Sequence, residues 1–440
     1  MDNFIKIKQI LALDGDIFFK IKESIYDKDR NGYHLGFKKF WLFAESLGEF
    51  KSALYVIDII SNILTKNNDK NKPLFFVSFR TKSTYAIAKK ILNSSGSFND
   101  IIYFFHPAGI FKKLSKRYTL AIKPDYFISI EHAVSNNLMN ELLKINTRIC
   151  FLNINSIVSK DIKTRPANWA KYSQTIFITV PDEDKKKSLE KIISLNSLNK
   201  FFRITALSSP LKFNTGFYAK NNGNSKNNDG IKYDSGLVIS FISIHKNESR
   251  FILKTVKKIV FDKDLNKNRD LKFIFVPRNI KISSRLFKIA SDFNLKPVYI
   301  NNINGNDIYE GFLKNNSFKS LIVNNYGSLD DIYPLSDIVY VGKSLYKREG
   351  GGHNILEPAS FGKAIMTGSH ASNFQDIILD MLKNDAVTVI TEHDFKNTLC
   401  KLINDDKLRQ NAGLNALRYY LETRDSSKEA LINYLSANFI

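Results

Sequence analysis

The chain has 440 residues, enough for two domains, because single hydrophobic cores stop growing near about 250–300 residues. Its 43% hydrophobic content is that of a globular protein, and its formal net charge at pH 7 is +22. The two cysteines, Cys150 and Cys400, lie far apart without metal-binding spacing, which argues against a disulfide framework and indicates a reducing compartment.

From Phe40 onward, short apolar segments alternate with helical patterns. Such alternation is typical of a parallel sheet wrapped by helices, so the first half of the chain is predicted to be an α/β domain. The predicted elements in chain order are a strand at Trp41–Ala44, a helix near Lys51–Leu64, a strand at Leu74–Ser78, a helix over Ser83–Leu92, and strands at Tyr126–Ile130, Arg148–Asn153 and Thr175–Thr179.

The segment from Asn214 to Gly236 is polar, carries several glycines and shows no hydrophobic period. We interpret residues 214–236 as a linker between a domain over residues 1–213 and a second α/β domain over residues 237–440. Ligands bind outside the carboxyl ends of strands in such sheets, so the loops there should line an interdomain cleft. In the second domain we expect strands at Leu237–Phe241, Phe273–Val276, Val298–Ile300, Ile338–Val341, Ala364–Met366 and Val387–Ile390.

A glycine-rich turn, Gly350–Asn354, follows the strand near Val339 and precedes the start of a helix. Successive glycines let the backbone take positive φ and approach a ligand closely, and a helix start favours a bound phosphate. Asn354 can cap this helix. Glu357 fits a capping box with Asn354, and it equally suits an acceptor of hydrogen bonds from ribose hydroxyls. A second polar turn, Gly368–Asp376, strengthens the interpretation of an anion site.

The excess of positive charge suits nucleic acid, an anionic membrane face or phosphorylated substrates, and the chain's richness in Lys, Asn and Ile explains part of it. No nucleic-acid-binding motif is visible, and no acidic or histidine cluster has metal-ligand spacing. We therefore predict no nucleic-acid partner, no metal and no cofactor.

No apolar run approaches the roughly 20 residues that span a bilayer, and the N-terminus lacks the pattern of a secretory signal. We expect a cytoplasmic protein whose membrane contact is at most peripheral. The best candidate for such contact is Phe104–Tyr118, where apolar side chains interleave with basic ones; an ordinary amphipathic surface helix is the alternative. The basic residues are Lys112, Lys113, Lys116 and Arg117.

Several motifs occur in the order found in one known family, the 3-deoxy-D-manno-octulosonic acid (Kdo) transferases. They are Phe40–Glu49 (FWLFAESLGE), Leu211–Phe213, Val276–Arg278, Val341–Leu345 and Gly351–Pro358. The chain resembles this family from about Phe40 to its C-terminal helices, most specifically in the second half. The resemblance implies the GT-B fold, with two Rossmann-like domains facing a cleft. It also implies inverting transfer of Kdo from CMP-Kdo to a lipid A precursor, lipid IVA, at the cytoplasmic face of the inner membrane in lipopolysaccharide biosynthesis.

The resemblance also implies roles for individual residues. Glu49 matches the glutamate taken as the base for the acceptor hydroxyl, although capping the next helix is an alternative role. The amides of Gly351, Gly352 and His353 would stabilise the charge that develops on the CMP leaving group. The donor-side set is Ser243, His245, Arg278, Gly351, Gly352, His353, Asn354, Glu357 and Asn373, and the acceptor-side set is Ser46, Gly48, Glu131 and Lys212.

The chain departs from the family pattern mainly on the acceptor side. Phe43 replaces a usual histidine, Glu45 adds a carboxylate, and His132–Asn137 replaces the motif Thr-Glu-Leu-Trp-Pro-Asn. In the donor half, Lys343 replaces a glycine. The acceptor and the number of sugars added therefore stay open. The alternatives are a related GT-B transferase with another acceptor or sugar, a non-catalytic nucleotide-binding paralogue and, less favoured, a nucleic-acid-binding protein.

Overall fold

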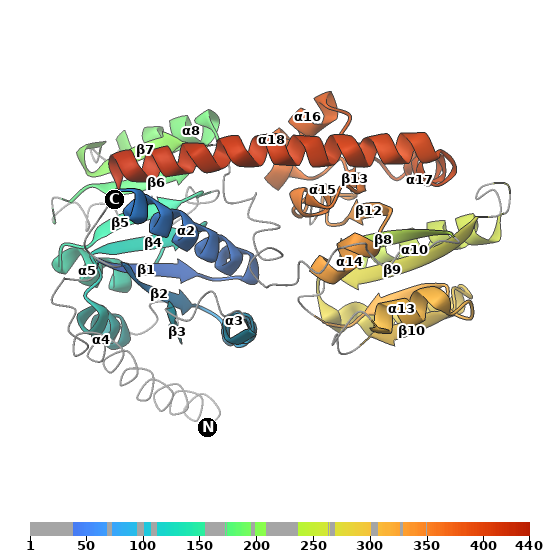
Figure 1. The fold of residues 1–440 in the computed structure, drawn as a ribbon, viewed down its shortest axis with the longest axis horizontal. Coiled ribbons are helices and arrows are strands. Elements are labelled where there is room, and N and C mark those ends of the chain that lie inside the picture. Colours follow the sequence, from blue (N-terminus) through green and yellow to red (C-terminus); the bar gives the residue numbers. More distant parts are fainter. Residues whose placement is uncertain are drawn as a thin grey trace, which may run out of the picture. The chain divides into compact units, whose positions relative to one another are not determined.

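The computed structural model describes residues 38–67, 73–94, 101–106, 112–154, 172, 174–194, 199–207, 236–262, 264, 269–300, 307–325, 329–348 and 350–440 (Figure 1). The predicted linker, apart from its last residue Gly236, lies outside the described residues, and so does the predicted site residue Lys212. The chain divides into two compact units. One comprises Met1–Phe217 with Ser426–Ile440, and the other comprises Tyr218–Asp425.

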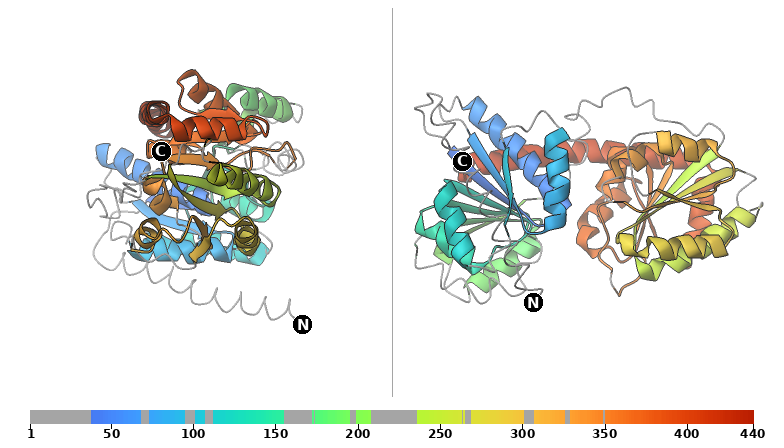
Figure 2. Two further views of the ribbon diagram at one scale, coloured as in Figure 1. Left: turned by 90° about the vertical axis from the view of Figure 1, so that its right-hand side faces the viewer. Right: turned by 90° about the horizontal axis from the view of Figure 1, so that it is seen from below.

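The first unit is built on a seven-stranded parallel sheet in the order β3-β2-β1-β4-β5-β6-β7. Helices lie on both faces of this sheet (Figure 2). The strands are β1 (Lys38–Ala44), β2 (Pro73–Phe79), β3 (Ile101–Phe105), β4 (Tyr126–Ile130), β5 (Arg148–Leu152), β6 (Ile176–Val180) and β7 (Phe202–Ala206). The helices are α2 (Leu47–Lys66), α3 (Lys82–Ser94), α4 (Lys112–Ile122), α5 (Asn136–Lys144) and α8 (Glu183–Ser194), with a 3-10 turn η2 (Asn199–Phe201).

Aromatic side chains form much of the core of the first unit. Trp41, Phe76, Phe104 and Phe127 are fully buried in one cluster, and the indole N–H of Trp41 donates to Ser78 Oγ at 2.7 Å. Burying such large side chains is a major source of stability. Phe104 is part of the candidate membrane segment that the sequence predicts. The structure corrects this prediction for Phe104, because a buried core residue is not available to a membrane.

The second unit contains another seven-stranded parallel sheet, in the order β10-β11-β9-β8-β12-β13-β14. Both sheets have the doubly wound strand order of Rossmann-like domains, which confirms the predicted α/β class. The strands are β8 (Gly236–Ile244), β9 (Asp270–Pro277), β10 (Pro297–Ile300), β11 (Ser320–Val323), β12 (Ile338–Val341), β13 (Ala364–Gly368) and β14 (Thr388–Ile390).

Helices and short 3-10 turns connect the strands of the second unit (Figure 1). The helices are α10 (Lys246–Phe261), α12 (Ser283–Asp292), α13 (Asp307–Lys314), α14 (Leu329–Leu335), α15 (Leu356–Ser360), α16 (Gln375–Lys383), α17 (Phe395–Asn404) and α18 (Asp406–Asn438). The 3-10 turns are η4 (Ile280–Ile282) and η5 (Ser372–Phe374).

The last helix, α18, belongs to both units, because its residues up to Asp425 count with the second unit and those from Ser426 with the first. Beyond its end, the ring of Phe439 packs against those of Tyr126 and Phe177, with centroids 5.3 and 5.7 Å apart. The prediction placed all of residues 237–440 in the second domain. The structure differs at this end because the buried Phe439 completes the aromatic packing of the first sheet.

Candidate active site

Charged side chains gather where the strands of the second unit end. Because these strands are parallel, the residues after their carboxyl ends lie along one edge of the sheet. His245 follows β8, Arg278 follows β9 and Lys343 follows β12. The backbone N–H of Arg278 donates to Ile244 O at 3.1 Å, which joins the ends of β8 and β9. Ser243, also predicted for the donor side, is buried near the end of β8, at the bulge between Ile242 and Ile244, with a φ of 56°.

Glu248, in the first turn of α10, organises the loop after β12 from inside the protein. Its side chain is buried with 1% exposure. The carboxylate accepts hydrogen bonds from the backbone N–H groups of Lys343 (2.8 Å), Ser344 (3.0 Å), Leu345 (3.0 Å) and His245 (3.4 Å) and from the hydroxyl of Tyr340 (3.2 Å). Buried carboxylates need such donors to offset their desolvation. Sequence analysis does not predict this role for Glu248, because the loop to which it bonds lies almost a hundred residues further along the chain.

The glycine turn takes the backbone conformation that its sequence predicted. Gly351 and Gly352 have φ values of +121° and +70°. A Cβ on Gly352 would lie 2.7 Å from the Cβ of Ala371, so only glycine fits there. The backbone N–H of Asn373 donates to Gly351 O at 3.0 Å. The two polar segments singled out in the sequence, Gly350–Asn354 and Gly368–Asp376, therefore pack against each other.

The amides of this turn are used differently from the prediction. The N–H of Gly351 donates to His370 O at 2.7 Å, and the N–H of Gly352 donates to Lys343 O at 2.9 Å. The expectation that these two amides face a phosphate is wrong for this conformation, because the fold itself already uses both donors. The two glycines instead shape the turn that positions His353.

Two histidines meet beside the turn and are surrounded by positive charge. His245 Nε2 and His353 Nε2 lie 3.2 Å apart, so a single proton fits between them. Burial, together with the positive charges of Arg278, His245 and Lys343, lowers the pKa of His353 to about 3. Burial and these cations keep the imidazole of His353 neutral. The same cations would stabilise an anion that binds beside it.

Asn354 and Glu357 both occupy the start of α15. Asn354 Oδ1 accepts from the N–H of Leu356 at 3.0 Å, so Asn354 bonds to the first turn as predicted, although Ile355 holds the N-cap position. Glu357 Oε2 accepts a hydrogen bond from the buried hydroxyl of Tyr333 at 3.0 Å. This contact fixes the carboxylate at the helix start, and its role toward a ribose stays a prediction.

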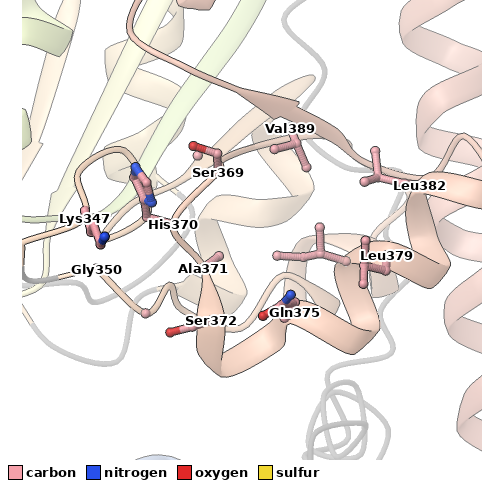
Figure 3. A pocket seen from close by; sticks show the side chains of 13 residues that line it. Lys347, Gly350, Ser369, His370, Ala371, Ser372, Gln375, Leu379, Leu382 and Val389 are labelled. Atoms are coloured by element: carbon pink, nitrogen blue, oxygen red, sulfur yellow. The ribbon is translucent and has the colours of Figure 1, made fainter.

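A cavity of about 510 Å³ opens beside the glycine turn (Figure 3). Polar groups of Lys347, Ser369 and His370 lie at one end, and the apolar side chains of Leu382 and Val389 lie at the other. The sequence did not indicate this cavity, although both predicted turns contribute to it. It is lined by Lys347, Gly350, Gly351, Gly368, Ser369, His370, Ala371, Ser372, Gln375, Ile378, Leu379, Leu382 and Val389.

In the first unit, Glu49 lies at the start of α2, directly after β1. Ser46 is the N-cap residue, and its Oγ accepts from the N–H of Glu49 at 3.3 Å. The carboxylate of Glu49 accepts from the Ser46 hydroxyl at 2.9 Å and from the N–H of Glu45 at 2.6 Å. Glu49, with 5% exposure, is thus held at the helix start by Ser46 and by the backbone before it, whereas the side chain that caps α2 is that of Ser46. Gly48 lies in the same first turn.

A histidine that the sequence marked only as a departure from the family completes this cluster. His132 Nε2 lies 3.4 Å from Glu49 Oε1 and 3.7 Å from Glu45 Oε2. The hydrogen bond to Glu49, together with the charges of Glu49, Glu45 and Glu131, raises the pKa of His132. Arg80 Nη1 binds Glu45 Oε1 at 2.5 Å. The cluster thus combines two carboxylates, Glu45 and Glu49, with two basic groups, His132 and Arg80.

Glu131, predicted on the acceptor side, lies next to this cluster at the end of β4. Its Oε1 accepts from Asn153 Nδ2 at 3.1 Å, and its backbone has a φ of 60°. A non-glycine residue takes this left-handed conformation only when its surroundings hold it there. Glu131 and Asn153 therefore join the ends of β4 and β5.

Helix α4 carries the basic residues of the candidate membrane segment. Leu114 and Tyr118 of this helix are buried, while Lys112, Lys113, Lys116 and Arg117 are exposed. The helix thus buries its apolar face in the unit and exposes its basic face. Among the described residues, no helix has the combined length and apolar character that crossing a bilayer requires. The same residues contain no group of three or more His, Cys, Asp or Glu side chains that could hold a metal ion.

Two Rossmann-like units with polar groups at their carboxyl strand ends define the GT-B class, as predicted. Solved structures agree at the level of the fold. The Staphylococcus aureus TarM G117R mutant, solved with UDP, superposes with a TM-score of 0.54 at 11% identity, covering 91% of this chain and 100% of that one. A glycosyltransferase from Rickettsia africae superposes with a TM-score of 0.53 at 11% identity, covering 93% of this chain and 100% of that one.

The sequence relatives of the chain include several Kdo transferases. The Kdo transferase of Aquifex aeolicus is 30% identical over 148 residues, which is 34% of this chain and 36% of that protein. The Kdo transferase of Rickettsia typhi is 24% identical over 388 residues, which is 83% of this chain and 71% of that protein. No protein-family model matches the chain. The matches to the first three curated relatives cover 36%, 41% and 49% of their lengths. The chain is a relative of the Kdo transferase family, as its motifs predicted.

Proposed function

We propose that this protein is an inverting glycosyltransferase that moves Kdo from CMP-Kdo to a lipid A precursor, lipid IVA, in lipopolysaccharide biosynthesis. One observation carries the proposal: a chain related to Kdo transferases places His245, Arg278, Lys343 and His353 together beside a glycine turn. This cluster has the positive charge that a nucleoside monophosphate requires.

On the donor side, the phosphate of CMP binds against Arg278, Lys343 and the histidine pair. When CMP leaves, negative charge grows on this phosphate, and fixed positive groups stabilise it in the transition state. Ser243 and Asn373 support the two turns, while Asn354 and Glu357 face the nucleoside. No metal is required in this scheme, because the side chains supply the positive charge.

On the acceptor side, the cluster around Glu49 takes the proton of the attacking hydroxyl. Ser46 and Gly48 shape the turn that holds Glu49, and Glu131 supports the neighbouring strand end. Lys212 is assigned to this side by the family resemblance.

The acceptor is an anionic lipid, so the protein must work at a membrane surface. We place it at the cytoplasmic face of the inner membrane as a peripheral protein. The exposed basic face of α4 supports this location, because each basic residue near an anionic leaflet contributes about 1 kcal/mol and this helix exposes several.

The test is CMP release by the purified full chain with CMP-Kdo and lipid IVA. We expect release only when both are present. Arg278→Ala should lower turnover by about 10²-fold, the usual effect of losing one group that stabilises developing charge. Arg285→Ala, an exposed arginine on α12, is the matched control and should leave turnover unchanged.

Two other outcomes would change the proposal. CMP release only with a different acceptor would make the protein a related GT-B transferase. CMP binding without release, with every acceptor tried, would contradict a catalytic role.

A further inference from the structure

The carboxylate assigned to base catalysis has little access to a substrate. Both oxygens of Glu49 already accept hydrogen bonds, Oε1 from the Ser46 hydroxyl and Oε2 from the N–H of Glu45. The side chain is only 5% exposed, whereas that of His132, 3.4 Å away, is 41% exposed. The group that a hydroxyl can reach in this cluster is therefore the imidazole.

The position of His132 is fixed by its local backbone. Its N–H donates to Ile130 O at 2.8 Å, and its carbonyl accepts from the hydroxyl of Ser129 at 2.5 Å. Glu131, just before it, holds the left-handed conformation with a φ of 60°. A catalytic group gains most when such contacts set its orientation before the substrate arrives.

The carboxylates orient the ring. Glu49 Oε1 and Glu45 Oε2 both face Nε2, at 3.4 and 3.7 Å. A hydrogen on Nε2 is therefore directed to these carboxylates, which leaves the lone pair on Nδ1 to face a substrate. Arg80 Nη1 binds Glu45 Oε1 at 2.5 Å. The positive charge of Arg80 therefore offsets part of the negative charge that Glu45 presents to the ring.

We propose that His132 Nδ1 takes the proton of the acceptor hydroxyl in this chain, with Glu49 and Glu45 as the carboxylates that hold and stabilise the imidazolium. This inference rests on the proposed transfer reaction and changes the base within it. As the acceptor oxygen forms its bond to the anomeric carbon, its O–H bond breaks and the proton moves to Nδ1. The bond from the anomeric carbon to the CMP phosphate breaks, and its electron pair leaves with CMP. The imidazolium then returns its proton to water.

This arrangement predicts a distinctive pH dependence. The groups that face His132 are Glu45 and Glu49 beside Nε2, Glu131 on its own turn, and Arg80 behind Glu45. The carboxylates raise the pKa of His132, so turnover should fall on the acidic side as the imidazole becomes protonated. Glu49→Gln removes one of these charges and should move that fall to lower pH.

The experiment measures the pH dependence of CMP release for the full chain and its variants. His132→Ala should lower kcat by about 10²–10⁴-fold, the range for loss of a general base, and free imidazole should restore part of it. His393→Ala, an exposed histidine of the second unit, is the control and should behave as wild type. Chemical rescue separates the proposed role from a structural one, because imidazole does not repair a misfolded protein.

The outcomes separate this inference from the proposed function. An active wild type with an equally active His132→Ala variant would overturn the role of His132 and leave the transfer reaction standing. An inactive wild type would overturn the reaction and this inference with it. Independently of turnover, the His132 ring signal should titrate at lower pH in Glu49→Gln by nuclear magnetic resonance. An unchanged titration would contradict the pairing of His132 with Glu49.

Discussion

Replacing Glu248 with glutamine, a side chain of nearly the same size, should loosen the loop after β12. In the structure Oε1 accepts from Ser344, Leu345 and Tyr340, and Oε2 accepts from Lys343 and His245. A glutamine keeps one acceptor oxygen and turns the other into an NH₂ donor. With the oxygen at the Oε1 position, the NH₂ group meets the N–H groups of Lys343 and His245 and leaves both unpaired.

The expected cost follows from those two donors. Each unpaired buried donor costs about 1–3 kcal/mol, so the loop should lose roughly 2–6 kcal/mol. Amide hydrogen exchange followed by mass spectrometry reads this change locally. A loss of 2 kcal/mol lowers the protection of the residue 342–345 amides about 30-fold, because about 1.4 kcal/mol corresponds to a factor of ten. CMP should also bind more weakly, since Lys343 lies in this loop.

Glu392→Gln is the matched control in the same unit. Glu392 is exposed and accepts from the Tyr346 hydroxyl at 2.5 Å, so its change should stay below about 1 kcal/mol. If protection of residues 342–345 in Glu248→Gln stays within threefold of wild type, the loop does not depend on this buried carboxylate and the reasoning fails.

Three further substitutions test other parts of the account. Gly352→Ala places a Cβ 2.7 Å from that of Ala371 at a φ of +70°, and should cost about 1–3 kcal/mol in urea unfolding. Gly311→Ala, on α13, adds a Cβ that meets no atom within 4 Å, and should instead stabilise the protein by about 0.5–1 kcal/mol. Equal effects of the two glycine substitutions would refute the packing argument. Lys343→Gly should be about 0.5–1 kcal/mol more stable than Lys343→Ala, because the φ of 63° suits glycine; the reverse order in thermal melts would contradict this strain. Burial lowers the pKa of His106 to about 4, so stability present above pH 6.5 is lost as the pH falls toward 4, by up to about 3 kcal/mol. His106→Phe should weaken this pH dependence, and urea midpoints at pH 7 and 4 that fall as in wild type would contradict it.

The alternating pattern located most of the sheets but missed three strands. β3, β7 and β11 were not predicted, whereas β1, β2, β4 and β12 were. β11, Ser320–Val323, has four residues, all buried, and a short apolar run of this kind looks the same in a strand and in a buried helix segment. Parallel strands buried on both faces also lack the apolar–polar alternation that marks exposed sheets.

The site was predictable where local sequence determines geometry. The positive φ values of Gly351 and Gly352 follow from the residue type, and the placement of Arg278 follows from its position after a strand. Long-range contacts could not be predicted in this way. Glu248 bonds to a loop 95 residues further on, and His132 meets Glu49 only after β1 and β4 pair in the sheet.

Family motifs assigned the glycine turn to a donor site, which local sequence alone could not do. They also assigned the amides of the turn to the CMP leaving group, although the fold itself uses the amides of Gly351 and Gly352. Hydrogen bonding of Gly351 and Gly352 to His370 and Lys343 depends on how two distant turns pack. Only the structure could show that these donors are already used.

Mass spectrometry of the lipid product tests the central claim most directly. Lipid IVA incubated with CMP-Kdo and the wild-type chain should gain one or more Kdo units, while Arg278→Ala, folded by circular dichroism, should yield about 10²-fold less product. Unmodified lipid IVA after incubation with a wild-type protein that binds CMP would contradict the claim that this chain is a Kdo transferase.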